Sequence, residues 1–180
     1  MSYRIVVKQG NLVEENTDFI VNASNTRLIL GSGVSMAFKR HCGIDLQKEL
    51  DTILESIDGE LEQGDVVASS TYKADNFKYA LHAAVMNYNQ GVRDKAKNPT
   101  LETIKKVLFN IENYLLWYAK NRSKKMKLVL PLLGCGVGGL NKPNVIALYK
   151  DFFQKEVDFE CEVVVYGYTL EDYDLIQSKI

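Results

Sequence analysis

The chain has 180 residues and a formal net charge of −1 at pH 7, and 46% of its residues are hydrophobic. This length and composition suit one domain, residues 1–180, with one well-buried core. Because a near-neutral chain has no overall positive field, we do not expect nucleic acid as a partner. The sequence contains neither an apolar run of about 18 residues nor an apolar N-terminal leader, which predicts a cytoplasmic protein without contact with a membrane.

The three cysteines, Cys42, Cys135 and Cys161, are odd in number and far apart. This pattern predicts neither a disulfide framework nor a zinc site, and it fits a reducing cytoplasm. The two histidines, His41 and His82, are also well separated, so we expect no metal centre. We expect no cofactor either.

Six short segments rich in β-branched and aromatic residues are predicted as strands. Several of them are continuous apolar runs, which is typical of strands buried on both faces. The predicted strands are residues 3–7, 19–22, 65–69, 79–85, 128–132 and 162–166.

Helical periodicities lie between these strands. One apolar stripe covers residues 46–57, with Asp45 expected to cap the helix and Gly43 to break the turn before it. The longest helix is predicted to begin near residues 98–99. Its end is marked by a basic cluster from Lys120 onward, the charge that suits a helix C-terminus.

Two further helices are predicted, one from about Pro143 and a short one over residues 170–178. Strands and helices therefore alternate along most of the chain. This alternation predicts an α/β sandwich, with a mostly parallel or mixed sheet covered on both faces.

Two glycine-containing loops follow predicted strands at the edge where open α/β sheets bind ligands. The first contains GSGV at residues 31–34, and the second reads PLLGCGVGGLNK at residues 131–142. Glycines let backbone N–H groups turn inward, and a following helix N-terminus adds partial positive charge. Neither residues 23–42 nor 131–142 contain an Asp or Glu, in a chain with 23 of them. Since desolvated like charges repel, we predict an anion site; the alternative is a pair of tight turns without a ligand.

Familiar phosphate-binding sequences do not match these loops. A Walker loop requires GxxxxGK followed by Ser or Thr, which the chain lacks. A dinucleotide-binding fingerprint ends in Gly or Ala, but the sequence that starts at Gly31 ends in Met36. Gly31 also comes too late after Asn22 for that tight turn. Hydride transfer is therefore a minor alternative.

Two reactive side chains have plainer interpretations. His82 lies inside an apolar strand, which is more typical of a hydrogen-bonded core histidine than of a catalyst. Cys135 lies between two glycines near a possible helix N-terminus, where the pKa of a thiol can fall. Because no histidine is near it in the sequence, a small packing residue is the favoured interpretation, with a nucleophile as the alternative.

With both loops identified, the chain resembles the macrodomain family over nearly its whole length. The similar segments are GNL at 10–12, DFIVNASNTRLILGSGVSMAFKRHCG at 18–43, KYALHAAV at 78–85 and LVLPLLGCGVGGLNK at 128–142. The resemblance implies a three-layer α/β/α sandwich with a central mixed, mostly parallel sheet. It also implies binding of ADP-ribose, and some family members hydrolyse ADP-ribose attached to proteins or related metabolites.

The resemblance implies roles for individual residues. Asn25 matches an asparagine that contacts the distal ribose and helps to place it, or a water, for hydrolysis. Asn11 and Leu12 match the loop near the adenine, and Tyr168, in preference to Tyr166, matches the aromatic residue that stacks near the adenine. The residues that match the two phosphate-binding loops are Gly31, Ser32, Gly33, Val34, Gly134, Cys135, Gly136, Val137 and Gly138.

Four positions depart from the family pattern. Ser32 replaces a common glycine, a small change that an amide-lined loop should tolerate. Asn11 replaces the usual Asp that accepts a hydrogen bond from the adenine amine. Ser35 and Gly138 stand where two hydrolase branches carry an Asp. Since the loops offer no carboxylate as a general base, we predict a protein that binds ADP-ribose, or an ADP-ribosylated protein or metabolite. The alternatives are a hydrolase that uses Asn25 and the ligand's phosphates to place water, and a phosphatase acting on ADP-ribose 1″-phosphate.

Overall fold

The central sheet of the protein has six strands in the order β1-β6-β5-β2-β4-β3. The computed structural model describes all residues, Met1 to Ile180. Every neighbouring pair of strands is parallel except β3 and β4, which are antiparallel. The predicted mixed, mostly parallel sheet is therefore confirmed. The strands are β1 (Tyr3–Gln9), β2 (Thr17–Asn25), β3 (Val66–Ser69), β4 (Phe77–Met86), β5 (Lys125–Pro131) and β6 (Glu160–Gly167).

Continuous apolar runs form the middle of the sheet because both of its faces are covered. Val163, Val164 and Val165 of β6, for example, have no exposed surface. All six predicted strands are present, but most of them are longer than predicted. β1 continues to Gln9 and β2 to Asn25, because polar residues at the strand ends also join the backbone ladder.

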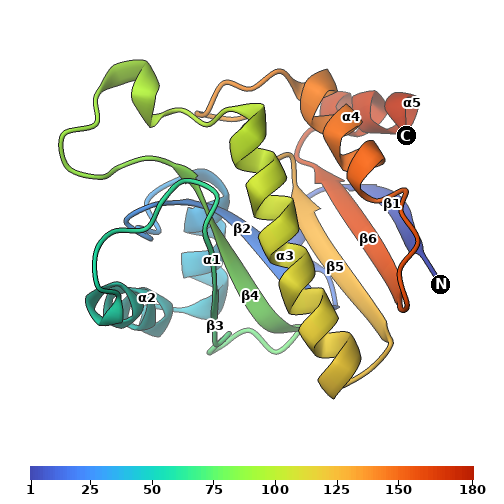
Figure 1. The fold of residues 1–180 in the computed structure, drawn as a ribbon, viewed down its shortest axis with the longest axis horizontal. Coiled ribbons are helices and arrows are strands. Elements are labelled where there is room, and N and C mark those ends of the chain that lie inside the picture. Colours follow the sequence, from blue (N-terminus) through green and yellow to red (C-terminus); the bar gives the residue numbers. More distant parts are fainter.

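Helices pack on both faces of the sheet (Figure 1). One face carries α3, α4 and α5, and the other carries α1 and α2, which gives the three layers of an α/β/α sandwich. Two short 3-10 helices, η1 (Leu12–Glu14) and η2 (Asp94–Lys97), lie in connections. The α-helices are α1 (Gly33–Cys42), α2 (Asp45–Ser56), α3 (Leu101–Asn121), α4 (Lys142–Phe152) and α5 (Leu170–Lys179).

Helix ends follow local sequence signals, with one exception. Gly43 ends α1 with a positive φ of 93°, as its place before α2 predicts. The expectation that Asp45 caps α2 is wrong: the cap position is Ile44, which makes no side-chain bond, and Asp45 is the first helical residue. Asp45 instead pairs with Lys48 one turn later. The long helix α3 starts at Leu101, two to three residues after the predicted start near 98–99, because Thr100 forms a capping box with Thr103.

The parallel strands bring their carboxyl ends together at one edge of the sheet. The segments that follow β2, β4 and β5 meet there, and so do those that follow β1 and β6. This edge is where a ligand is expected in an open α/β sheet. None of the helices is both long and apolar enough to cross a membrane.

Candidate functional site

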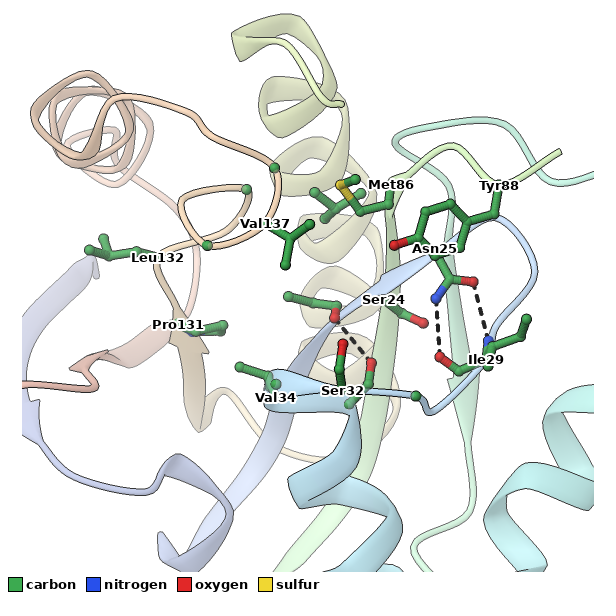
Figure 2. Close-up of a pocket in the computed structure, with 18 residues that line it drawn as sticks. Ser24, Asn25, Ile29, Ser32, Val34, Met86, Tyr88, Pro131, Leu132 and Val137 are labelled. Carbon is green, nitrogen blue, oxygen red and sulfur yellow. Dashed lines mark hydrogen bonds between the residues drawn. The ribbon is translucent and has the colours of Figure 1, made fainter. Parts of the chain in front are cut away.

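A cavity of about 380 Å³ opens at this edge, between the ends of β2, β4 and β5. Figure 2 shows Asn25 and Tyr88 toward one end of it and Pro131 and Leu132 toward the other. No Asp, Glu, His, Lys or Arg side chain lines it. The lining residues are Ala23, Ser24, Asn25, Ile29, Gly31, Ser32, Gly33, Val34, Ser35, Val85, Met86, Tyr88, Pro131, Leu132, Gly134, Gly136, Val137 and Gly138.

The N-terminus of α1 forms one wall of the cavity. Its cap residue, Ser32, has an extended backbone and makes no side-chain bond to the first turn. The first turn contains no acidic residue, whereas the last turn carries Lys39 and Arg40. The backbone N–H groups at the start of the helix therefore keep their positive partial charge toward the cavity. A bound anion would satisfy them.

The second glycine loop forms the opposite wall by folding tightly on itself. Leu140 N donates to Gly134 O over 2.9 Å, and Gly139 N donates to Gly136 O over 3.1 Å. A Cβ on Gly138 would lie 2.7 Å from Gly134 O and 2.9 Å from the ring of Pro99, so no larger residue fits there. The loop thus requires glycine for close packing as well as for access to a ligand.

The two loops differ in how they use the helix that follows. We expected both to lead into helix N-termini facing the anion. The N-terminus of α4, however, is capped by Asn141, whose Oδ1 accepts from Asn144 N over 3.1 Å. The cavity lining ends at Gly138, before that cap. Of these two helices, only α1 has an uncapped N-terminus, and the second loop contributes loop amides instead.

Asn25, at the end of β2, shapes the first loop from within. Its Oδ1 accepts from Arg27 N over 3.0 Å. The same oxygen accepts from Ile29 N over 3.2 Å, and Nδ2 donates to Ile29 O over 3.0 Å (Figure 2). One N–H of the amide remains for a ligand. The side chain therefore holds the loop in addition to any contact with a ligand.

A side chain from a neighbouring helix holds each loop from behind. Gln47 of α2 donates to Leu28 O over 3.0 Å and accepts from Leu30 N over 2.8 Å. These bonds fix Leu28 at a positive φ of 52°, an unfavourable conformation for a branched residue. Tyr149 of α4 is fully buried; its hydroxyl donates to Pro131 O over 2.6 Å and accepts from Leu133 N over 2.9 Å. Both loops are thus organised before any ligand binds.

A chain of buried polar side chains runs from the cavity into the sheet. Ser35 Oγ contacts Asn22 Oδ1 over 3.1 Å, and Asn22 Nδ2 contacts His82 Nδ1 over 3.0 Å. His82 Nε2 then contacts Ser69 Oγ over 2.7 Å. His82 is fully buried and bonded at both nitrogens, which confirms the interpretation as a core histidine. Burial lowers its pKa to about 3, so the ring is neutral at pH 7.

The cavity brings together nine of the residues predicted from the sequence. They are Asn25, Gly31, Ser32, Gly33, Val34, Gly134, Gly136, Val137 and Gly138. Cys135 is not among the lining residues; its Sγ contacts Leu133 O over 3.6 Å, and burial raises the pKa of its thiol to about 11. No group of three or more His, Cys, Asp or Glu side chains is arranged to hold a metal.

Three predicted residues lie outside the cavity lining, beyond the ends of β1 and β6. Asn11 accepts from Val13 N and caps η1, whereas the Leu12 side chain is buried in the core. Tyr168 is 80% exposed, and its carbonyl accepts from Gln9 Nε2. Tyr168 follows β6, which pairs with β5, whereas Asn11 and Leu12 follow β1, one strand further from β5 at the same edge of the sheet.

Sequence reasoning missed several lining residues, above all Ser24 and Tyr88. Ser24 is 4% exposed, and its Oγ has no hydrogen-bond partner in the protein. Tyr88 follows β4 and is partly exposed. Ligands bind beyond the carboxyl ends of the parallel strands in open α/β sheets, and we used this rule for the loops after β2 and β5. The same rule applied to the end of β4 would have identified Tyr88.

Comparison with known proteins identifies the family. The model of the family described as Macro domain matches residues 21–149. An uncharacterised protein of Sulfolobus acidocaldarius is 25% identical over 91% of this chain and 83% of its own length. A macro domain-containing protein of Listeria monocytogenes is 33% identical over 51% of each chain. The chain matches 26% of the length of a Thermotoga maritima protein, at 26% identity over 89% of this chain, so it spans only a part of some relatives.

Solved structures have the same fold. The Oceanobacillus iheyensis macrodomain with ADP is 22% identical, with a TM-score of 0.76 over 97% of this chain and 88% of that chain. The Trypanosoma brucei macrodomain in complex with ADP-ribose is also 22% identical, with a TM-score of 0.69 over 97% and 68% of the chains. The macrodomain of Mycobacterium tuberculosis DarG is 20% identical, with a TM-score of 0.72 over 92% and 99%.

Proposed function

Because this chain belongs to the macrodomain family, we propose that its cavity binds ADP-ribose, either free or attached to a protein or metabolite. The observation that carries this proposal is the uncapped N-terminus of α1, which faces the cavity opposite a glycine loop. A diphosphate between them would accept hydrogen bonds from both walls. The absence of carboxylates from the lining avoids repulsion of that charge.

The proposed ligand lies across the ends of several strands. We propose that its base end lies toward β6 and β1, the strands that Asn11 and Tyr168 follow, and its terminal ribose toward β2 and β4, near Asn25 and Tyr88. Asn11 already uses its Oδ1 to cap η1. One lone pair of this neutral oxygen remains for the adenine amine, and it is a weaker acceptor than a carboxylate.

Binding is the primary function in this proposal, and hydrolysis is secondary. No side chain that could act as a general base near pH 7 lines the cavity. Release of ADP-ribose, or phosphatase action on ADP-ribose 1″-phosphate, would need the ligand's own phosphate oxygens and the amide of Asn25 to place a water. Incubation with mono-ADP-ribosylated protein, followed by measurement of released ADP-ribose, separates the two functions.

Calorimetric titration with ADP-ribose tests the proposal. A variant that places a carboxylate at the N-terminus of α1 provides a second test. Ser32→Asp should cap α1 and repel the diphosphate, so we expect an affinity loss on the order of 100-fold without loss of the fold. Ser32→Asn is the matched control, because it offers a cap of the same size without the charge. If wild-type protein gives no binding heat at ~1 mM ADP-ribose, the proposal is wrong.

A further inference from the structure

The polar chain behind the cavity fixes which way the hydroxyl proton of Ser35 points. Two protein atoms lie within hydrogen-bond distance of Ser35 Oγ: Asn22 Oδ1 at 3.1 Å and Ala23 O at 3.2 Å. A carbonyl oxygen can only accept, and a hydroxyl has a single proton to donate. The Ser35 hydroxyl therefore donates its proton to one of these two protein oxygens.

Ser69, at the inner end of this series of polar side chains, determines the orientation of the Asn22 amide. Ser69 Oγ donates to Ser70 O over 3.0 Å, so it accepts from His82 Nε2. With its proton on Nε2, neutral His82 presents a bare Nδ1 that accepts from Asn22 Nδ2. Asn22 Oδ1 must then face Ser35 as an acceptor. Asn22 and His82 have no exposed surface, so water does not alter this arrangement.

We infer that Ser35 presents only hydrogen-bond acceptor lone pairs to the cavity, and that it thereby selects a ligand with a sugar hydroxyl at this position. A phosphate oxygen is an acceptor and would be repelled by these lone pairs, whereas a ribose hydroxyl would donate to them. The neighbouring Ser24 hydroxyl differs, because it has no partner in the protein and can either donate or accept.

This inference deepens the proposed function and rests on it. Ser35 is bonded to β2, the end of the cavity assigned to the terminal ribose. The amides at the start of α1 bind the diphosphate, and the side chain of Ser35, the third residue of the helix, accepts from the sugar. Ser35 would therefore favour ADP-ribose over ADP, which lacks the terminal sugar.

Calorimetry with ADP-ribose and with ADP tests this role. We expect Ser35→Ala to weaken ADP-ribose binding about tenfold, the effect of one ordinary hydrogen bond, and to change ADP binding less than twofold. Ser35→Cys nearly keeps the volume of the side chain but accepts hydrogen bonds weakly, so it should lose the same preference. Ser178→Ala on α5 removes a hydroxyl that also donates to a backbone carbonyl, Leu175 O, and should change neither affinity.

Each other outcome has a distinct meaning. If Ser35→Ala and Ser35→Cys weaken the binding of ADP-ribose and of ADP equally, Ser35 acts on the diphosphate at the N-terminus of α1, and the inference is overturned. It is also overturned if neither variant weakens ADP-ribose binding, or if wild-type protein binds both ligands with equal affinity. Wild-type protein that binds neither ligand would overturn the proposed function itself.

Discussion

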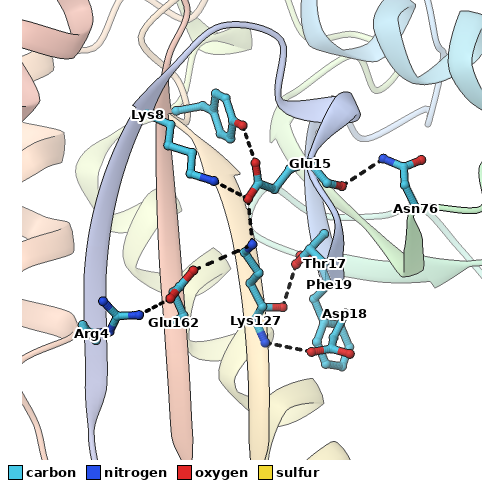
Figure 3. Close-up of polar contacts among 10 residues, drawn as sticks. Arg4, Lys8, Glu15, Thr17, Asp18, Phe19, Asn76, Lys127 and Glu162 are labelled. Carbon is cyan, nitrogen blue, oxygen red and sulfur yellow. Dashed lines mark hydrogen bonds and ion pairs between the residues drawn. The ribbon is translucent and has the colours of Figure 1, made fainter.

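Tyr166 and Glu15, 151 positions apart in the sequence, share a hydrogen bond of 2.6 Å between the tyrosine hydroxyl and the Glu15 carboxylate. The other carboxylate oxygen of Glu15 lies 2.6 Å from Lys8 Nζ and 2.7 Å from Lys127 Nζ (Figure 3). One carboxylate thus ties the connection after η1 to β1, β6 and β5. Lys127 also pairs with Glu162, which reaches Arg4, so the charges continue across this face of the sheet.

This cluster predicts acid-sensitive stability that depends on Glu15. Burial alone would raise the pKa of Glu15, but hydrogen bonds from Lys127, Lys8 and Tyr166 outweigh it and lower the pKa to about 2. Because the pKa in the folded protein is below its value of 4.5 in the unfolded chain, the stabilisation is complete above pH 4.5. It is lost as the pH falls from about 4.5 to about 2.

Glu15→Gln removes the charge and leaves Lys8 without its partner. It leaves Lys127 with only the longer contact to Glu162. We expect the free energy of unfolding at pH 7 to fall by about 3 kcal/mol, measured by urea denaturation, and the difference from wild type to shrink toward pH 2. Glu160→Gln serves as control, because Glu160 is exposed and pairs with Lys125 at 3.7 Å only. Its effect should stay below about 0.5 kcal/mol. Equal effects of the two variants would contradict the role of Glu15.

His82 adds a second, separate acid transition. Its pKa of about 3 in the folded protein, lowered by burial, lies below the unfolded value of 6.5, so the unfolded state takes up a proton first. Stability should decline as the pH falls below 6.5, by about 2 kcal/mol at pH 5. This decline should persist in Glu15→Gln, because the Glu15 carboxylate affects stability only at lower pH, between about 4.5 and 2. In NMR spectra the His82 ring signals should not titrate between pH 8 and pH 5; a titration near 6.5 would show that the ring is not buried as described.

A feature of the fold or of the site can be predicted from the sequence when the residues that specify it are neighbours in the chain. The strands and both glycine loops could be predicted, because apolar runs, glycines and missing carboxylates are contiguous in the chain. Gln47 and Tyr149 could not be recognised as supports of the loops, since their bonds join helices to backbone atoms that only the fold brings close. The same is true of Ser35: its neighbours in the sequence reveal nothing of Asn22 and His82, which set its proton.

Tyr149→Phe tests whether the second loop must be held from behind. The change removes the donor to Pro131 O and the acceptor from Leu133 N, and it leaves both backbone groups buried without a partner. We expect a stability loss of about 2 kcal/mol and a loss of ADP-ribose affinity of about tenfold. Tyr114→Phe on α3 removes a comparable hydroxyl that donates to Val66 O over 3.2 Å. Because it does not touch the loop, that variant should bind ADP-ribose as wild type does; unchanged binding by Tyr149→Phe would contradict the prediction.

Substitution of two glycines in the second loop distinguishes a packing role from a role in ligand binding. A Cβ at position 138 would lie 2.7 Å from Gly134 O and 2.9 Å from Pro99, whereas a Cβ at Gly136 would meet no atom within 4 Å. Gly138→Ala should therefore distort the loop and lower the melting temperature by several degrees, for a cost of about 2 kcal/mol. Gly136→Ala should leave the melting temperature of the free protein unchanged. If the ligand's diphosphate approaches the backbone at Gly136, that variant will still lose ADP-ribose affinity. Loss of affinity without loss of stability would then identify Gly136 as a contact site, and equal stability losses would contradict the packing of Gly138 against Pro99.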